Sequence, residues 1–272
     1  MTPRRHLQIE ITAAEHGATA CELLAGRAGL SKTRVKDAMA KGAVWLRRRK
    51  GKRQRLRRAT TVPAAGEVLE LFYDQALLNR RPPAAVCLLA EAHYSVWDKP
   101  AGLLAQGNEY GDHCSLLRQA ELALRRPAYL VHRLDREAAG LMLIAHSRAG
   151  AAELSRLFRE QRITKHYRVR VRGRVGESHG TISKPLDGKP AVTVYSLLHY
   201  DAETDSSLLL VDLKTGRLHQ IRRHLAQLGF PVLGDPRYGR ANTGKGDLQL
   251  EAVKLAFRCP FSGRQRSFSR SA

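Results

Sequence analysis

The chain has 272 residues, of which 47 are Lys or Arg and 25 are Asp or Glu, so its formal net charge is +22. Hydrophobic residues make up 43% of the chain, which is enough for a packed core and excludes a disordered protein. The longest uninterrupted apolar stretch, residues 84–90, is far shorter than the roughly 20 residues of a membrane-spanning helix. No secretory signal is visible at the N-terminus. We therefore expect a cytoplasmic protein with one large and one small domain.

The cysteines and the charge narrow the possible partners. Cys21, Cys87, Cys114 and Cys259 are too far apart for a zinc ribbon or finger, so we expect four reduced thiols and no metal. A large positive surplus is most easily tolerated when an anion neutralises it, and nucleic acid is the usual anion. A solvated basic surface and an anionic membrane surface are the alternatives.

The positive charge is concentrated near the N-terminus. Residues 1–75 hold 16 Lys or Arg and 7 Asp or Glu, and nine of the twelve positions 47–58 are basic. Such a run is either a disordered strap or a charged hairpin along a phosphate backbone. The flanking sequence favours the hairpin, because residues 43–46 and 68–73 are short apolar strands. Two helices, at 19–28 and 31–40, are predicted before it.

This order of elements resembles the S4-like RNA-binding domain of ribosomal proteins. The resemblance implies that the start of the second helix, the segment after it and the basic run face RNA. The residues concerned are Ser31, Lys32, Arg34, Lys41, Arg47, Arg48, Arg49 and Lys50. We place this domain at residues 1–75, an extended Pro-containing linker at 76–85 and a second domain at 86–272.

The stretch 129–145 carries the first candidate for chemistry. Asp135 lies between Arg133 and Arg136 on a loop before an apolar strand at 141–145. Nearby positive charge favours an ionised carboxylate, which can act as a nucleophile or general base beside a cleft. The alternative reading is a salt-bridged loop residue.

Two later segments follow. Strict alternation over 167–172 predicts a strand that points Tyr167 toward its apolar face, either as a core residue or as a platform that stacks on a base. A helix capped at Ser147 precedes that strand. Further on, residues at helical spacing predict a helix with a buried stripe, entered at Arg217; the stripe consists of Leu218, Ile221, Leu225 and Leu228.

Together these segments resemble the RluA-type pseudouridine synthases over about residues 86–268. The motifs stand in the family's order: Lys-Pro at 99–100, His-Arg-Leu-Asp-Arg to Gly at 132–140, Lys-His-Tyr at 165–167, Thr-Gly-Arg to Ile-Arg at 215–222 and Leu-Gly-Asp to Tyr-Gly at 233–239. The resemblance implies that Asp135 is the catalytic aspartate, that Tyr167 stacks on the target base and that Arg217 pairs with Asp135. It also implies that Arg133 fills the gap left by the flipped nucleotide, and we expect Arg222 to contact RNA.

The resemblance further implies an α+β fold: a small S4-like domain followed by a catalytic domain on a mixed, mainly antiparallel sheet flanked by helices. No metal or cofactor is implied. The expected activity is isomerisation of specific uridines in structured RNA, ribosomal RNA being favoured over transfer RNA. We expect a monomer without an obligatory protein partner. The alternatives are a noncatalytic S4-type RNA-binding protein and a DNA- or membrane-binding protein of unrelated fold.

Overall fold

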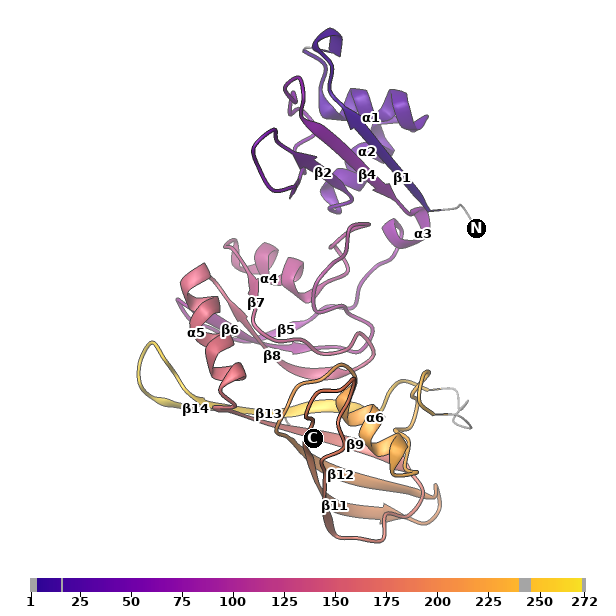
Figure 1. The fold of residues 1–272 in the computed structure, drawn as a ribbon, viewed down its shortest axis with the longest axis vertical. Coiled ribbons are helices and arrows are strands. Elements are labelled where there is room, and N and C mark those ends of the chain that lie inside the picture. The colour runs from indigo at the N-terminus through magenta and orange to yellow at the C-terminus, as the bar shows by residue number, and fades with distance from the viewer. Residues whose placement is uncertain (1–3, 16, 240–245, 271–272) are drawn as a thin grey trace. The chain divides into compact units, whose positions relative to one another are not determined.

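The computed structural model describes residues 4–15, 17–239 and 246–270 and separates into two compact units (Figure 1). The first unit runs up to Pro82 and also contains Gln106–Gln119, and the second unit consists of Pro83–Ala105 and Ala120–Ala272. The segment Gln106–Gln119 departs from the prediction that all residues after 85 form the second domain.

The first unit is built on a four-stranded antiparallel sheet in the order β1-β4-β2-β3. Its elements are β1 (Arg5–Glu10), a 3-10 turn (Ala13–Glu15), α1 (Ala20–Ala28), α2 (Lys32–Ala40), β2 (Val44–Arg47), β3 (Gln54–Arg55), β4 (Val68–Tyr73) and α3 (Gln75–Leu78). The hydroxyls of Thr19 and Ser31 cap α1 and α2, and Gly29 ends α1 in the left-handed region. Buried side chains from both helices and the sheet form one core.

The predicted hairpin and linker can now be compared with the structure. The basic run does form a hairpin, because β2 pairs with β3 through Trp45 opposite Arg55. The linker is different from the prediction at its start. Residues 75–78 form α3, since the carboxylate of Asp74 accepts a hydrogen bond from Leu77 N and caps a helical turn.

The second unit is built on a ten-stranded mixed sheet (Figure 1). Eight strands follow the order β10-β11-β12-β9-β13-β8-β6-β5, while β14 pairs with β13 and β7 with β8. All of these pairings are antiparallel except that of β13 with β8. The strands are β5 (Val86–Ala90), β6 (Tyr94–Lys99), β7 (Tyr129–Leu130), β8 (Ala139–Ala145), β9 (Ile163–Arg172), β10 (His179–Ile182), β11 (Thr193–Asp201), β12 (Ser206–Leu213), β13 (Leu250–Arg258) and β14 (Gln265–Ser269).

The parallel pair β8–β13 lies in the middle of this sheet and demands a glycine. Gly140 has φ of +115°, and a Cβ added there would lie 2.2 Å from the carbonyl oxygen of Ala252 on β13. No larger residue fits this close approach of two backbones. The loop that carries Asp135 therefore leads directly into a strand whose position is tightly fixed.

The remaining helices are α4 (Leu116–Leu124), α5 (Arg148–Arg159) and α6 (Gln220–Gln227). In the second unit α5 contacts β8, and α6 contacts β11. The capped helix after Ser147 is confirmed. The last helix is shorter than predicted: it begins at Gln220, and Leu218 and Leu228 are 58% and 43% exposed instead of buried.

Two further expectations concern composition. All four cysteines are free thiols, as predicted. Within the described ranges, no helix combines the length and the apolar character that a bilayer crossing requires.

Candidate active site

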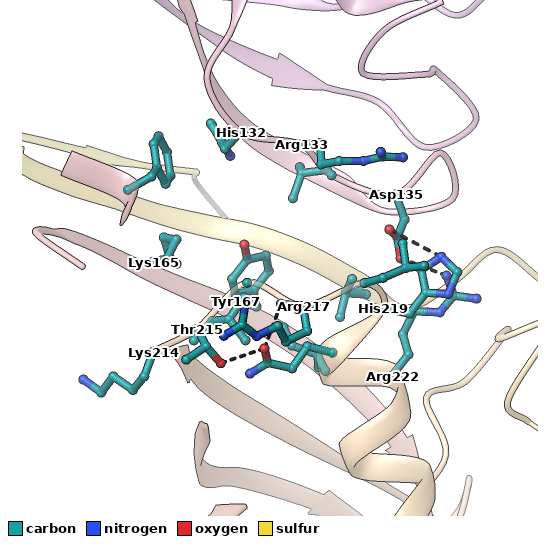
Figure 2. Close-up of a pocket in the computed structure, with 18 of the residues that line it drawn as sticks. His132, Arg133, Asp135, Lys165, Tyr167, Lys214, Thr215, Arg217, His219 and Arg222 are labelled. Carbon is teal, nitrogen blue, oxygen red and sulfur yellow. Dashed lines mark hydrogen bonds and ion pairs between the residues drawn. The ribbon is translucent and has the colours of Figure 1, made fainter. Parts of the chain in front are cut away.

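A pocket of about 720 Å³ opens in the second unit and gathers most of the predicted motifs (Figure 2). Its walls come from the loop before β8, the end of α5, the start of β9 and the turn that enters α6. Lining residues include Arg133, Asp135, Tyr167, Arg217 and His219. The fold thus brings together residues that are up to 119 positions apart, from Val131 to Leu250.

Asp135 lies in this pocket on the loop between β7 and β8. Its side chain is 17% exposed, and its Oδ2 accepts a hydrogen bond of 2.8 Å from Nη1 of Arg222. The other oxygen, Oδ1, lies 3.7 Å from Nε2 of His219. The carboxylate is therefore held by an arginine while it retains contact with solvent in the pocket.

Arg222 is itself fixed by a second aspartate. Its Nε and Nη2 donate to the two carboxylate oxygens of Asp235 at 2.8 Å each. Its side chain is 1% exposed and that of Asp235 is 0% exposed. Burial alone would lower the pKa of Arg222, but the hydrogen bonds that it donates to Asp235 and Asp135 raise this pKa above its usual range. The guanidinium thus stays charged and points one N–H at Asp135.

The environment of Asp235 favours its ionised form. Burial would raise its pKa, but the hydrogen bonds from Arg222 and from the backbone N–H groups of Arg237 and Tyr238 lower it. The turn at 233–239, which carried little meaning as sequence, therefore supplies the anchor of the buried arginine.

The predicted pair between Arg217 and Asp135 is wrong. The Nε of Arg217 donates to the carbonyl oxygen of Pro190 at 2.9 Å, and the ion pair with Asp135 is made by Arg222. The predicted RNA contact at Arg222 is also wrong, because the side chain is buried and each of its three guanidinium nitrogens donates to Asp135 or Asp235. The sequence did contain a signal: Arg222 stands beside Ile221 and three positions before Leu225 on the buried face of a helix, where a charge needs a partner.

The turn before α6 is held by Gln220 rather than by Arg217. The side-chain oxygen of Gln220 accepts from Arg217 N and from the Thr215 hydroxyl, at 2.9 and 2.7 Å. Its amide nitrogen donates to Val192 O and to the Thr193 hydroxyl. This network fixes the loop that places Arg217 on the pocket wall.

Tyr167 stands on β9, with Val211 and Ala252 opposite it on the neighbouring strands. As predicted from the alternation, it lies on the buried face of β9 and is only 7% exposed. Burial, together with the negative charge of Asp135, raises its pKa well above the usual value, so the phenol stays protonated. Tyr167 lines the same pocket as Asp135 (Figure 2).

His132 and Lys99 form hydrogen bonds with backbone groups in and around the loop that carries Asp135. Nε2 of His132 accepts from Leu143 N on β8 at 2.9 Å, and its ring stacks on Phe158 with centroids 4.3 Å apart. Although part of this ring reaches the pocket, loss of solvation and the charge of Lys165 lower its pKa to about 3, so it is neutral. The buried Nζ of Lys99 donates to the carbonyl oxygens of Leu103 and Arg136. Burial lowers the pKa of Lys99 to about 8.

Arg133, predicted to fill the gap of a flipped nucleotide, is exposed and lines the pocket. It is one of several basic residues there, the others including Arg159, Lys165, Lys214 and Arg217. Within the described ranges, no group of three or more His, Cys, Asp or Glu side chains has the arrangement of a metal site.

The RNA contacts predicted in the first unit lie on exposed or locally paired side chains. The Ser31 hydroxyl caps α2, Lys32 pairs with Glu22, and Nζ of Lys41 binds Asp37 and the carbonyl oxygen of Leu78. Arg34 and the four basic residues at the start of the hairpin are exposed; the latter are Arg47, Arg48, Arg49 and Lys50.

The other side of the hairpin is engaged by the segment Gln106–Gln119. Arg55 and Arg57 both form ion pairs with Asp112, and Arg53 pairs with Glu109 at 2.9 Å. The guanidinium of Arg55 also lies 4.2 Å from the ring of Trp45, a cation–π contact. Three of the nine basic residues in the run are thus already matched by carboxylates of this segment.

Comparisons with known proteins agree with this architecture. Residues 93–227 match the family model described as RNA pseudouridylate synthase. The "Dual-specificity RNA pseudouridine synthase RluA" of Pasteurella multocida is 35% identical over 217 residues, which cover 71% of this chain and 97% of that protein. The "Ribosomal large subunit pseudouridine synthase D" of Nitrosomonas europaea is 36% identical over 57% of this chain and 50% of its own length.

A solved structure shares the fold. "Human RNA Pseudouridylate Synthase Domain Containing 1" superposes with a TM-score of 0.60 at 24% identity, covering 71% of this chain and 86% of its own. The match of the fold, the extent of the RluA alignment and the ordered motifs around one pocket converge on one family. The chain belongs to the RluA-type RNA pseudouridine synthases, a family of isomerases that act on RNA.

Proposed function

We propose that this protein isomerises specific uridines in structured RNA to pseudouridine and that Asp135 is its catalytic residue. The observation that carries the proposal is the ion pair of Asp135 with Arg222, which in turn is locked by Asp235 at the floor of an open pocket. A carboxylate held in a fixed direction and open to solvent suits attack on a bound nucleotide.

The reaction can be followed through its bonds. The N1–C1′ glycosidic bond breaks, the uracil turns within the pocket, a bond forms between C5 and C1′, the C5 proton leaves and N1 gains a proton. We assign to Asp135 the attack on ribose or base that starts this sequence. The base must leave its stack first, which costs a few kcal/mol and is least expensive in loops.

Other pocket residues have supporting roles in this proposal. The ring of Tyr167 stacks on the uracil, a role that fits a protonated phenol on the pocket wall. Arg133, which is exposed at the pocket, takes the place of the extruded nucleotide. Arg217 is assigned to RNA contact from the pocket wall instead of to the ion pair with Asp135.

The first unit is proposed to be an S4-like RNA-binding domain that brings a large RNA to the pocket. Its support is the order of two capped helices, a sheet and a basic hairpin, with exposed charges at Arg47, Arg48, Arg49 and Lys50. A domain of this kind favours ribosomal RNA over transfer RNA. The name of the P. multocida relative, a dual-specificity synthase, favours testing more than one RNA class. We further propose that the protein works as a monomer in the cytoplasm, where its free thiols would stay reduced.

A pseudouridine map of total RNA tests these assignments together. The gene is deleted and then restored as wild type, as Asp135→Asn or as Asp187→Asn. The last is a matched control, because Asp187 is an exposed aspartate that pairs with Arg223 on the same helix as Arg222. We expect one or more sites to vanish on deletion and to return with wild type and Asp187→Asn only. Return of the sites with Asp135→Asn would contradict the catalytic role.

A further inference from the structure

His219 occupies a position that its residue type does not favour. It immediately precedes α6 with a φ of +51°, a left-handed backbone that residues with a Cβ adopt only at a cost. A helix start of this kind usually carries Ser, Thr, Asp, Asn or Gly, but the His219 side chain makes no capping hydrogen bond. Residues in strained backbone conformations cluster at functional sites, so the contacts of this side chain can indicate its role.

The side chain of His219 is directed to the catalytic carboxylate. Its Nε2 lies 3.7 Å from Oδ1 of Asp135 (Figure 2). Its Nδ1 lies 3.0 Å from the hydroxyl of Tyr238. The rings of His219 and Tyr238 meet edge to face with centroids 5.7 Å apart. At 3.7 Å the contact with Asp135 is electrostatic rather than a hydrogen bond.

The proton on this imidazole has a preferred place. Desolvation and the charges of Arg222 and Arg237 lower the pKa of His219, so the ring is neutral at neutral pH. If the neutral ring carried its proton on Nδ1, the lone pair of Nε2 would point at the negative carboxylate of Asp135, and the two would repel each other. The favoured tautomer therefore carries its proton on Nε2 and accepts a hydrogen bond from Tyr238 at Nδ1.

We propose that His219, with Tyr238 behind it, is a positioning residue for Asp135: Arg222 holds Oδ2, and the Nε2–H of His219 faces Oδ1. This inference rests on the proposed function, since it concerns how the catalytic carboxylate is aimed. The hydroxyl of Tyr238 fixes which nitrogen of His219 carries the proton. Both carboxylate oxygens are then fixed, and rotation of the carboxylate about its Cβ–Cγ bond is restricted.

Several charged or titratable groups face His219. Asp135 comes from the loop before β8, Arg222 from α6, and Asp235, Arg237 and Tyr238 from the turn at 233–239. The pKa of Arg222 is raised and that of Asp235 is lowered, so neither changes its charge near neutrality. Protonation of His219 below its pKa would place a second cation on Asp135 and make the carboxylate less available for attack.

The first test is a titration of the histidine rings by NMR in the full-length protein without RNA. The His219 signal is identified by its loss in His219→Asn. We expect Asp135→Asn to lower the pKa of His219, because a facing negative charge is removed. Tyr238→Phe should raise it by about half to one pH unit, because a hydrogen bond to the neutral ring is lost. In Tyr200→Phe, which removes a tyrosine hydroxyl bonded to Asp205 instead, the His219 signal should not move.

The sign of the shift decides the outcome of this test. If the Tyr238 hydroxyl instead accepted a hydrogen bond from Nδ1–H, removing that hydroxyl would lower the pKa of His219. A lowered or unchanged pKa in Tyr238→Phe overturns the proposed arrangement, and so does an unchanged pKa in Asp135→Asn. This measurement needs no substrate, so its result is independent of which RNA the protein modifies.

The second test separates positioning from structure. Asn is suited to both the left-handed backbone and the helix cap, so His219→Asn should keep or raise the midpoint of thermal unfolding. On ribosomal RNA extracted from the deletion strain, its kcat should fall by about 10-fold or more with little change in KM. His199→Asn, at an exposed histidine on β11, serves as the control. The fall of kcat at acid pH should move to higher pH in Tyr238→Phe and be lost in His219→Asn.

Failure of the inference can be told from failure of the proposed function. Full activity of Asp135→Asn would remove the proposed function and, with it, the need for positioning. An inactive Asp135→Asn beside a His219→Asn of undiminished kcat would overturn the inference alone. A His219→Asn that unfolds at lower temperature and loses activity only in that proportion would do the same, because it would show a structural role.

Discussion

The pocket and the basic hairpin both pair arginines with aspartates, but in opposite ratios. In the pocket one arginine, Arg222, serves two aspartates, Asp135 and Asp235. In the hairpin one aspartate, Asp112, serves two arginines, Arg55 and Arg57. The pocket cluster is left with a surplus negative charge and the hairpin cluster with a surplus positive charge.

The surroundings of the two clusters differ as well. The side chains of Arg222 and Asp235 are 1% and 0% exposed, whereas those of Arg55 and Arg57 are 17% and 26% exposed. Charges that are buried away from water interact more strongly, and a buried charge without a partner lowers the stability of the fold. The same residue types can therefore orient a reacting group in one place and leave charge for a polyanion in the other.

The largest effect on stability and activity is expected when the cluster of Arg222, Asp135 and Asp235 is disrupted. Arg222→Lys keeps the charge but cannot donate to three carboxylate oxygens in one plane. A hydrogen bond to a charged group contributes about 1.5–3 kcal/mol, so loss of two of the three should lower the free energy of unfolding by about 3 kcal/mol or more in urea titrations. Pseudouridine formation should be lost. Arg223→Lys, whose partner Asp187 is exposed, is the control and should change the free energy of unfolding by less than about 1 kcal/mol.

An intermediate effect on stability is expected when the pH is lowered. The pKa of Asp235 is lowered in the folded protein, so its contribution to stability is present above its unfolded value, 3.8 in a model peptide, and is lost as the pH falls through the folded value. Unfolding curves between pH 7 and pH 2 should show that loss. In Asp235→Asn the stability should be lower at pH 7 and should vary less below pH 4. If the stability of this variant fell below pH 4 as much as that of the wild type, the acid sensitivity would belong to other carboxylates.

A smaller effect is expected from neutralising the start of the hairpin. Changing the exposed residues Arg47, Arg48, Arg49 and Lys50 to Gln should leave the unfolding midpoint almost unchanged. For every RNA phosphate that these side chains no longer neutralise, the slope of log affinity against log salt should become shallower by about 0.7 to 0.9. Affinity for extracted ribosomal RNA, measured at several salt concentrations, gives that slope. A slope equal to that of the wild type would show that these four residues do not contact RNA.

The smallest effect should come from Asp112→Asn, which releases Arg55 and Arg57 from their shared partner. The pairs are partly exposed, so the loss of stability should stay near 1 kcal/mol. Binding of RNA should tighten and its salt dependence should steepen, because two cations become available. Weaker binding would mean that Asp112 shapes the hairpin more than it competes with phosphate.

The sequence predicted the elements that local residues decide. The strand at 68–73 is confirmed, as are the helix capped at Ser147 and the buried placement of Tyr167. In each case the signal lies within a few residues: a hydroxyl before a helix, or an alternation of apolar and charged side chains.

The sequence did not predict features that depend on distant partners. The start of α6 was placed too early. The resemblance assigned to Arg217 the ion pair that is made by Arg222, whose partners lie 87 and 13 positions away. The left-handed conformation of His219, whose side chain contacts Asp135 and Tyr238, has no local signature. The membership of Gln106–Gln119 in the first unit depends on pairs with Arg53, Arg55 and Arg57, all more than 50 positions earlier.

That last feature has a consequence for synthesis on the ribosome. The chain leaves the first unit after Pro82 and returns to it at Gln106, so the unit lacks its last segment while residues 83–105 are made. At about 5–20 residues per second this takes about one to five seconds. Until Asp112 has been made, Arg55 and Arg57 lack its carboxylate, so the hairpin carries more unpaired positive charge than it does in the finished unit. The acidic segment thus arrives as a late partner that completes an almost finished domain.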